Sequence, residues 1–301
     1  MNLSKLDSIL VTGFFRTGST LIFSALRQCP DLQVFYEPYH PDIVDYVIAC
    51  QNGKATADRA RLGHTVEGDY FEEYRNIDID HMQNFFNKEA RTLHHPILEA
   101  TSSKPDLFNY VDFLHNCAKE SGKIPVLQAN RFNLCLSWFS ARFPNNYNIL
   151  ITRKPRQIFY SLKKLAFKEG LSLNSNTIGL DYWNVLSIFN SLCSRYSFID
   201  ELYKGYYYKL CFVVEWINRI ESNKADLVLP YEFLPCSSTN TVIKTIFNSF
   251  SCNTDMILDY ISNNYFELPC MEKSEELLVI ENTVEEQING LITKYFHGLI
   301  V

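Results

Sequence analysis

Short runs of apolar residues alternate along this chain with longer segments in which apolar residues recur at helical spacing. The short runs have the length and composition of buried parallel strands. We predict five strands, at Ile9–Thr12, Gln33–Tyr36, Pro125–Leu127, Asn148–Thr152 and Asp226–Leu229. The longer segments predict helices, among them Thr20–Gln28, Leu107–Ser121, Leu134–Arg142 and Pro155–Lys168. This alternation indicates an α/β fold with a central parallel sheet flanked by helices.

Two segments depart from the alternating pattern. Val66–Asp80 mixes acidic and aromatic residues, and we predict an acidic insertion over the sheet at about 62–82. From about residue 235 the pattern is mainly helical, and Glu272–Tyr295 predicts a closing helix. The chain shows no internal repeat, low-complexity tract or linker composition. We therefore expect a single domain over residues 1–301.

Composition narrows the class of protein. With 47% hydrophobic and 21% charged residues, the chain has enough apolar material for a buried core. Its net charge of -6 argues against a general nucleic-acid binder. We find no secretory leader before Ser8–Val11 and no apolar run of roughly 18 residues that could span a membrane. The nine cysteines form no C-x-x-C pair, which is typical of buried thiols in a reducing compartment, so we expect a soluble cytoplasmic protein.

The first predicted strand leads into a glycine turn with the spacing of a phosphate-binding loop. Gly13 and Gly18 enclose the turn and Thr20 keeps the hydroxyl, but Ser19 replaces the lysine of nucleotide kinases. A positive charge lies three residues earlier, at Arg16. A turn between a strand and a helix directs backbone N–H groups at an anion. The turn therefore predicts a site for a phosphate-like group other than Mg-ATP, with a purely structural glycine turn as the alternative.

A second basic element follows the fourth predicted strand. Arg153 stands at the carboxyl end of this strand, where open α/β sheets bind ligands. Pro155 suits the first turn of a helix, and Ser161, eight residues after the arginine, can face the same pocket. An arginine with a hydroxyl can hold a second, separate phosphate. The alternative is a solvated charge run of Arg153, Lys154 and Arg156.

Together, the two elements resemble the sulfotransferases that use 3′-phosphoadenosine 5′-phosphosulfate (PAPS). In that family, a basic residue, a hydroxyl residue, a glycine and two more hydroxyl residues hold the 5′-phosphosulfate. The matching residues here are Arg16, Thr17, Gly18, Ser19 and Thr20. A later Arg-x-Pro and a serine hold the 3′-phosphate in the family, and Arg153, Pro155 and Ser161 match that pattern. Arg142–Pro144 is also similar, as is the segment beginning at Tyr231, a further expected cofactor contact.

The resemblance covers about residues 8–250 and departs from the family pattern in two places. Lys154 stands where an acidic residue or an asparagine is usual. The glycine-rich cofactor loop near the C-terminus of cytosolic members has no counterpart in this sequence. The resemblance therefore does not say which residues enclose the adenosine.

An acceptor hydroxyl also needs a base, and Glu37 is the main candidate. It follows the second predicted strand at the sheet edge that carries the phosphate loop, and burial can raise a glutamate pKa toward working pH. At Glu37-Pro38 the chain resembles carbohydrate-type and several bacterial members, in which this glutamate is the expected base. A capping role beside Pro38 is the alternative, and His40 is the second candidate. Gln128 and Asn130 replace the lysine and histidine of cytosolic members.

Two further polar features give weaker signals. His94-His95 has no carboxylate at ligand spacing, so we expect no metal site there. The acidic residues near 62–82 would attract a cationic acceptor if they surround the opening of the site. A solvated surface loop is the alternative interpretation of this segment.

These observations predict a sulfotransferase that moves a sulfuryl group from PAPS to a hydroxyl or amine of a small soluble metabolite or natural product. A sulfuryl group carries less negative charge than a phosphoryl group, so we expect in-line transfer without a metal, with Arg16 stabilising the bridging oxygen. The alternatives are a divergent P-loop kinase that needs Mg²⁺ and a scaffold that binds the product 3′-phosphoadenosine 5′-phosphate (PAP) without turnover. We expect no nucleic-acid or membrane partner. The acceptor and the oligomeric state are not determined by the sequence.

Overall fold

A computed structural model describes residues 6–54, 69–85, 97–168, 184–196, 205–250, 252–265 and 275–296. The described strands form one parallel sheet in the order β2-β3-β1-β4-β5. The strands are β1 (Ser8–Gly13), β2 (Leu32–Tyr36), β3 (Ile124–Gln128), β4 (Asn146–Thr152) and β5 (Leu227–Pro230). The α/β fold with a central parallel sheet is therefore confirmed, and each predicted strand coincides with an observed one within two residues.

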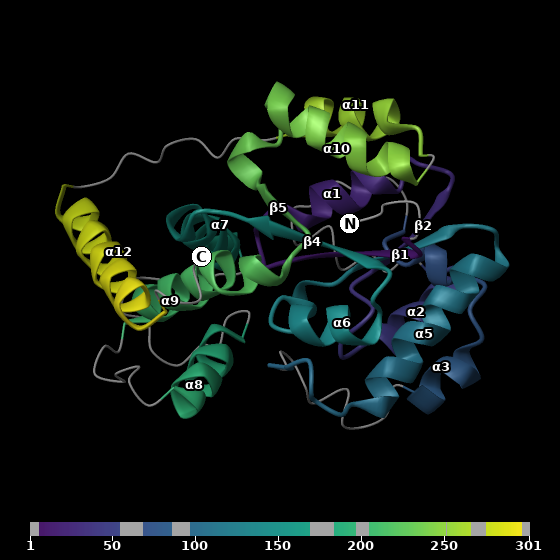
Figure 1. The fold of residues 1–301 in the computed structure, drawn as a ribbon, viewed down its shortest axis with the longest axis horizontal. Helices are drawn as coiled ribbons and strands as arrows, with labels where there is room; N and C mark the ends of the chain where they lie inside the picture. The colour runs from purple at the N-terminus through teal and green to yellow at the C-terminus, as the bar shows by residue number, and fades with distance from the viewer. Residues whose placement is uncertain are drawn as a thin grey trace.

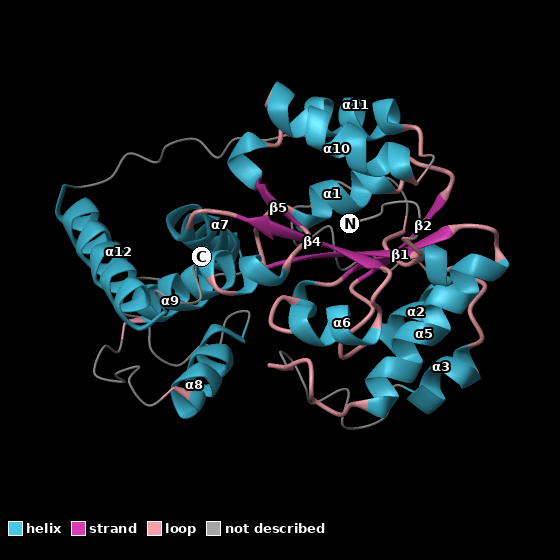
Figure 2. Cartoon of the chain, viewed as in Figure 1, coloured by secondary structure: helices cyan, strands magenta, loops and turns pink. Residues whose placement is uncertain are grey.

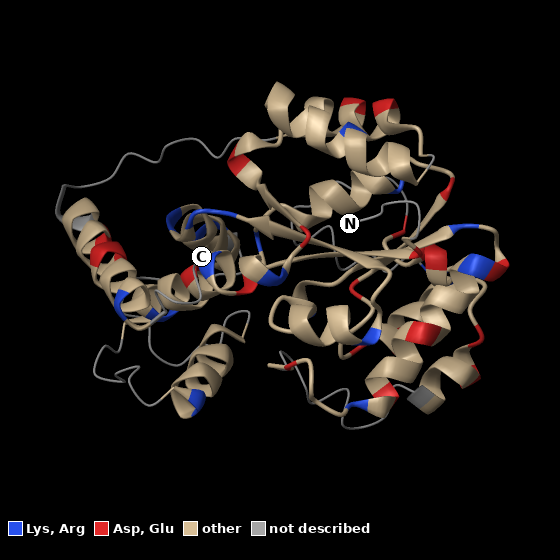
Figure 3. Cartoon of the chain, in the orientation of Figure 1, with Lys and Arg blue, Asp and Glu red and all other residues tan. Residues whose placement is uncertain are grey.

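The strands are apolar because helices cover both faces of the sheet. No strand contains a lysine, arginine, aspartate or glutamate, as the uncoloured sheet in Figure 3 shows. β1 is buried along its whole length and pairs with β3 and β4, so that Leu10 lies opposite both Leu127 and Asn148. Parallel strands buried on both faces need this continuous apolar character.

Helices form a layer on each side of the sheet (Figure 1 and Figure 2). One layer contains α1 (Ser19–Leu26), α10 (Ser237–Ser249) and α11 (Thr254–Asn264). The other contains α2 (Ile43–Gln51), α3 (Ile79–Phe85), α5 (Pro105–Glu120) and α6 (Leu136–Arg142). At the left in Figure 1 lie α7 (Pro155–Lys168), α8 (Val185–Arg195), α9 (Tyr206–Arg219) and α12 (Glu275–Phe296). Short 3₁₀ turns join these elements at η3 (Glu72–Tyr74), η4 (Asn130–Phe132), η6 (Glu221–Lys224) and η7 (Tyr231–Phe233).

The strand order creates a switch point at the centre of the sheet. β1 connects through α1 to β2 on one side, whereas β3 connects through η4 and α6 to β4 on the other. Neighbouring strands whose connections leave in opposite directions open a crevice at their carboxyl ends, and ligands bind there in open α/β sheets. The β1–α1 loop, the end of β2 and η4 all lie at this edge.

The helix α12 is held to α7 and α9 by partly buried charged and polar groups. Arg156 of α7 donates from Nε to Glu285 Oε1 at 2.9 Å and forms an ion pair with Glu281. Tyr207 of α9 also donates to Glu285, at 2.6 Å, and Tyr160 of α7 donates to Glu281. Three helices that are far apart in the sequence therefore meet in one polar cluster.

The predicted acidic insertion is only partly described. Residues 55–68 lie outside the described part, as do His94 and His95, and the visible remainder begins at Asp69 with η3 and α3. The structure does not test the expectation of a single domain, which stays a prediction. None of the described helices is long and apolar enough to cross a membrane. The cysteines of the described part are all free thiols.

Candidate active site

The predicted phosphate loop connects β1 to α1 in a tight turn. Gly18 adopts φ 96°, and a Cβ added to it would lie 2.2 Å from Cδ2 of Tyr231. A Cβ on Gly13 would lie 2.6 Å from the carbonyl oxygen of Ile151 in the neighbouring strand. Both glycines are therefore required by close contacts, and Gly18 also by its left-handed backbone. Within the turn, Thr17 donates a hydrogen bond to the carbonyl of Phe14 at 2.6 Å.

The loop presents the amino end of α1 at the switch point. Ser19 is the first residue of this helix and Thr20 the second. The first N–H groups of a helix have no acceptor within the helix, and the helix dipole adds a partial positive charge at this end. Such an end favours an anionic group. The predicted phosphosulfate residues thus occupy one continuous turn and helix start.

The second basic element meets the loop directly, because β4 lies beside β1. Arg153 donates from Nη1 to the carbonyl oxygen of Arg16 at 2.8 Å and from Nε to Gln157 at 3.0 Å. Arg16 in turn donates from Nε to Ser161 Oγ at 2.9 Å. The structure therefore brings Arg16, Arg153 and Ser161 together.

The charge-run alternative does not describe these three basic residues. Arg153 is buried, Lys154 is exposed, and Arg156 binds the carboxylates of α12. These three neighbouring residues therefore have different surroundings: Arg153 lies at the candidate site, Lys154 in solvent and Arg156 in the polar cluster with α12. Only Arg153 belongs to the sheet edge at which the phosphate loop lies.

Burial places the two arginines in an unfavourable environment. Burial lowers the pKa of Arg16 from its ordinary value, and the nearby charge of Arg153 lowers it further. Burial likewise lowers the pKa of Arg153, against the opposing effect of Tyr231 and Glu232. Guanidinium groups nevertheless stay protonated in proteins. Two such charges close together favour the binding of an anion between them.

Tyr231 joins the loop to the second basic element. Its ring lies against Gly18, and the ring centroid is 4.1 Å from Cζ of Arg153. Tyr265, which follows α11, stacks on Tyr231 with centroids 5.1 Å apart. The predicted contact Tyr231 is therefore adjacent to Arg153, and Tyr265 is a neighbour that no sequence motif marked.

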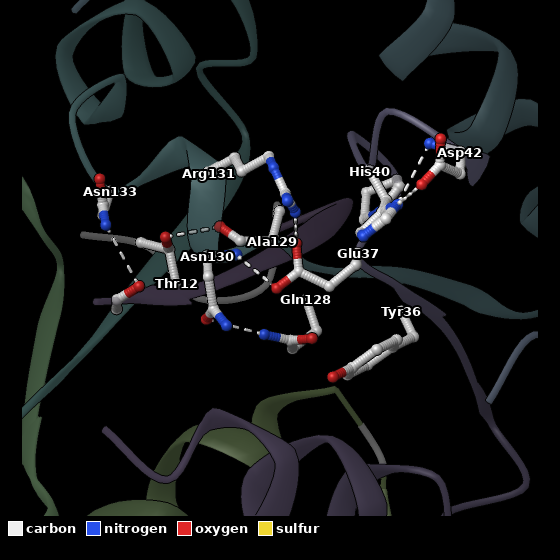
Figure 4. Close-up of polar contacts among 12 residues, drawn as sticks. Thr12, Tyr36, Glu37, His40, Asp42, Gln128, Ala129, Asn130, Arg131 and Asn133 are labelled. Atoms are coloured by element: carbon white, nitrogen blue, oxygen red, sulfur yellow. Dashed lines mark hydrogen bonds and ion pairs between the residues drawn. The ribbon is translucent and has the colours of Figure 1, made fainter. Parts of the chain in front are cut away.

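Glu37 (Figure 4) directly follows β2 and has an unusual backbone conformation, with φ 42°. Its backbone N–H donates to the carbonyl of Gln128 at 2.7 Å, and its side chain turns toward η4. Asn130 donates its backbone N–H to Oε1 at 3.3 Å, and Arg131 donates from Nη1 to Oε2 at 3.2 Å. The carboxylate is thus bound by η4, and it does not cap its own turn through these contacts.

The candidates that compete with Glu37 have other roles in the structure. His40 accepts a hydrogen bond at Nδ1 from the backbone N–H of Asp42 at 3.1 Å, and its ring lies beside Tyr46. Gln128 donates to Asn130 Oδ1 at 3.0 Å, and both side chains are buried. A paired amide stands at each position where cytosolic members carry their lysine and histidine.

Two acidic residues of η3, Glu72 and Glu73, pair with Arg27, which directly follows α1. Arg27 binds both carboxylate oxygens of Glu73 and donates to the carbonyl of Asp69 at 2.7 Å. Glu72 lies 3.6 Å from the same guanidinium. Burial raises the pKa of Glu73 to about 7. These carboxylates hold the segment to the end of α1. Among the described residues, no group of histidine, cysteine, aspartate and glutamate could hold a metal ion.

Several contacts of the site were not found from the sequence. Gln157 lies four residues after Arg153 on α7, a helical spacing that could have indicated the contact. Asn218 of α9 donates to the carbonyl of Arg153 at 3.0 Å, and Arg131 binds Glu37. No local pattern marks Asn218, because it reaches the site only through the packing of α9. Arg131 follows a predicted strand and could have been considered on the same ground as Arg153.

The fit between Gly18 and Tyr231 gives a test of the loop geometry. We expect Gly18→Ala to lower the free energy of unfolding by more than the ~1–2 kcal/mol of a left-handed alanine, because its Cβ also meets the Tyr231 ring. Urea unfolding measures the loss. Gly122→Ala is the matched control, since Gly122 has φ 69° but open space around it. In a Tyr231→Ala background, Gly18→Ala and Gly122→Ala should lower the free energy of unfolding by the same amount. If Gly18→Ala still costs more there, by the same margin as in the wild type, the contact with Tyr231 is contradicted.

Comparison with known proteins identifies the family. The model of a group described as the sulfotransferase family matches residues 8–210, more than half of the chain. No curated protein matches the sequence.

Two solved structures are similar to this protein. One is the sulfotransferase STF1 from Mycobacterium tuberculosis H37Rv, at 15% identity and a TM-score of 0.43, covering 95% of this chain and 77% of that one. Another is the sulfotransferase STF9 from Mycobacterium avium, at 12% identity and a TM-score of 0.48, covering 97% and 76%. The family model spans both phosphate-binding elements and the Glu37 turn, and on this match the chain belongs to the sulfotransferase family.

Proposed function

We propose that this protein transfers a sulfuryl group from PAPS to a hydroxyl or amine of a small molecule. The observation that carries the proposal is the contact of Arg153 with the carbonyl of Arg16. Through it, the phosphate loop and the arginine–serine element lie together, and we propose that they hold the two ends of a doubly phosphorylated nucleotide. A nucleotide kinase would not need a second phosphate-binding element, such as Arg153 with Ser161, beside its phosphate loop.

The residues present fit PAPS in charge and in hydrogen-bonding chemistry. The Gly18 turn and the start of α1 would hold the 5′-phosphosulfate, and Arg153 with Ser161 would hold the 3′-phosphate. The ring of Tyr231 lies beside both groups and offers a surface for the nucleoside. PAPS would supply the sulfuryl group through the bond between its sulfur and a 5′-phosphate oxygen. As that bond breaks, Arg16 and the loop N–H groups would stabilise the charge on the oxygen.

Glu37 is the proposed base for the acceptor. It would take the proton from the acceptor hydroxyl or amine as the new bond to sulfur forms, while the electrons of the broken bond leave with PAP. An ionised carboxylate is needed for this step, and the neighbouring Arg131 favours that form. Only 4% of Glu37 is exposed, so acceptor binding has to open a path to the carboxylate.

For the acceptor, we favour a soluble metabolite or natural product in the cytoplasm. The preference for a cationic acceptor depended on acidic residues near the opening. Arg27 already pairs with Glu73 and Glu72 of the described acidic residues, so these two carboxylates give the idea no support. The charge of the acceptor and the choice between O- and N-sulfation have to be determined by testing a panel of candidate acceptors.

Ligand-induced stabilisation tests the proposed donor site. We expect PAP without metal to raise the melting temperature of the protein, because a ligand at 100 times its Kd adds about 2.7 kcal/mol to the free energy of unfolding. ATP with Mg²⁺ is the comparison. Stabilisation by Mg-ATP alone would replace the proposal with a kinase. If PAP binds but no acceptor in a broad panel releases PAP from PAPS, the protein is a PAP-binding scaffold.

Arg153 gives the second test of the donor site. We expect Arg153→Ala to weaken PAP binding by about 1.5–3 kcal/mol, the range for a hydrogen bond to a charged group. Isothermal titration measures the affinity. Lys154→Ala removes an exposed cation next to Arg153 and serves as the matched control, with a change well under that of Arg153→Ala. Equal affinities of the Arg153→Ala variant and the wild type would remove this residue from the site.

Glu37 gives the test of the base. We expect Glu37→Gln to slow the release of PAP from PAPS about 100-fold or more, because the amide cannot take a proton. The affinity for PAP should stay within a few-fold, since Asn130 and Arg131, which bind the Glu37 carboxylate, belong to η4 and not to the proposed phosphate-binding elements. Glu120→Gln changes an exposed glutamate at the end of α5 and is the control. A wild-type rate in Glu37→Gln would rule out the base assignment.

A further inference from the structure

Glu37 and Arg131 form a buried ion pair next to the proposed donor site. Arg131 Nη1 lies 3.2 Å from Glu37 Oε2, and their side chains are only 8% and 5% exposed. Removing two charges from water costs several kcal/mol per ion, and apolar residues of similar volume often replace such pairs without loss of stability. A contribution to folding stability therefore does not by itself explain why the protein has this buried ion pair.

The backbone of Glu37 is held in a conformation that fixes the direction of its carboxylate. A non-glycine residue at φ 42° is strained and persists only where its surroundings enforce it. Here the N–H of Glu37 binds Gln128, and its carbonyl accepts from the N–H of His40 at 2.9 Å. The two carboxylate oxygens have separate donors on η4, Asn130 N and Arg131 Nη1 (Figure 4). Position and rotation of the carboxylate are thus both fixed.

Arg131 also reaches the phosphate loop. Its Cζ lies 5.5 Å from the ring centroid of Phe15, the residue before Arg16. Arg131 Nε has no hydrogen-bond partner among the described residues, so the guanidinium depends strongly on Glu37 for its compensation. One arginine therefore links the carboxylate to the loop that would hold the sulfuryl group.

We propose that Arg131 is a positioning residue that keeps the Glu37 carboxylate charged and aimed at the acceptor. This inference rests on the proposed function, in which Glu37 is the base. When Glu37 takes the proton of the acceptor, Arg131 loses its anionic partner in a buried place. This loss favours release of the proton to solvent and returns the carboxylate to its charged form for the next turnover.

Three cations or potential cations come from the elements around Glu37: Arg131 of η4, Arg16 of the phosphate loop and His40 of its own turn. Tyr36 adds a titratable hydroxyl from β2. Arg131 is bonded to the carboxylate directly, from Nη1 to Glu37 Oε2 at 3.2 Å. Removal of the Arg131 charge should therefore let Glu37 bind a proton at higher pH, by about 1–3 pH units.

Titration of the Glu37 carboxyl tests this directly, without PAPS or an acceptor. The protein is labelled with glutamate carrying ¹³C in the side-chain carboxyl, and the signal missing from Glu37→Gln identifies Glu37. We expect Arg131→Met and Arg131→Gln to raise the titration midpoint by about 1–3 pH units. Arg131→Lys, which keeps a cation, should stay within about half a unit of the wild type. An unchanged midpoint in a folded, uncharged variant would overturn the proposal.

Controls separate this inference from loss of folding and from failure of the proposed function. Arg142→Met removes an exposed arginine at the end of α6 and should change neither the midpoint nor PAP binding. Melting temperature and PAP affinity establish that each variant is folded, and Arg131→Gln serves as the test if Arg131→Met is not. If Glu37→Gln releases PAP at the wild-type rate, both the assignment of Glu37 as the base and the proposed role of Arg131 are contradicted. If Glu37→Gln releases PAP slowly but the Arg131 variants leave the titration midpoint of Glu37 unchanged, only the proposed role of Arg131 is contradicted.

Discussion

The hydrogen bond from Arg153 to the carbonyl of Arg16 is the contact on which the rest of the site depends. It is possible because β1 and β4 are neighbours in the sheet, so that the turns after both strands meet at one edge. The contact fixes the carbonyl side of the loop while the side chain of Arg16 reaches Ser161 on α7. A backbone held in this way can direct its N–H groups to an anion without reorganising first, which is the condition for strong electrostatic stabilisation.

The candidate site brings two buried guanidinium groups, those of Arg16 and Arg153, to one edge of the sheet. The pKa values of Arg16 and Arg153 are both lowered by burial, so the unliganded protein bears a desolvation cost at this point. Arg156 has a different environment, because its guanidinium group pairs with the carboxylates of Glu281 and Glu285 on α12. Two tyrosine hydroxyls donate hydrogen bonds to the same carboxylates. The contrast distinguishes Arg156, which joins helices, from the two arginines that we propose to bind the donor.

The sequence predicted the features that depend on local pattern. Strand positions follow from apolar runs, and Gly18 with Arg16 follows from loop spacing, so these were accessible without coordinates. Contacts that depend on how helices pack were not accessible. Asn218 and Tyr265 reach the site from α9 and from the end of α11, and neither lies in a motif. The proposed roles of Arg16, Arg153, Ser161, Tyr231 and Glu37 stay predictions, although the structure gathers them at one sheet edge.

The environment of Glu37, the proposed base, differs in charge from that expected with the lysine and histidine of cytosolic members. Gln128 and Asn130 pair with one another and carry no charge, so they neither compete for the proton nor repel a cation beside them. Arg131 can then approach the carboxylate as its charged neighbour. A lysine at Gln128 would place a second cation near Arg131 and weaken the ion pair by repulsion. The neutral amide pair and the buried Glu37–Arg131 pair are therefore two parts of one electrostatic arrangement.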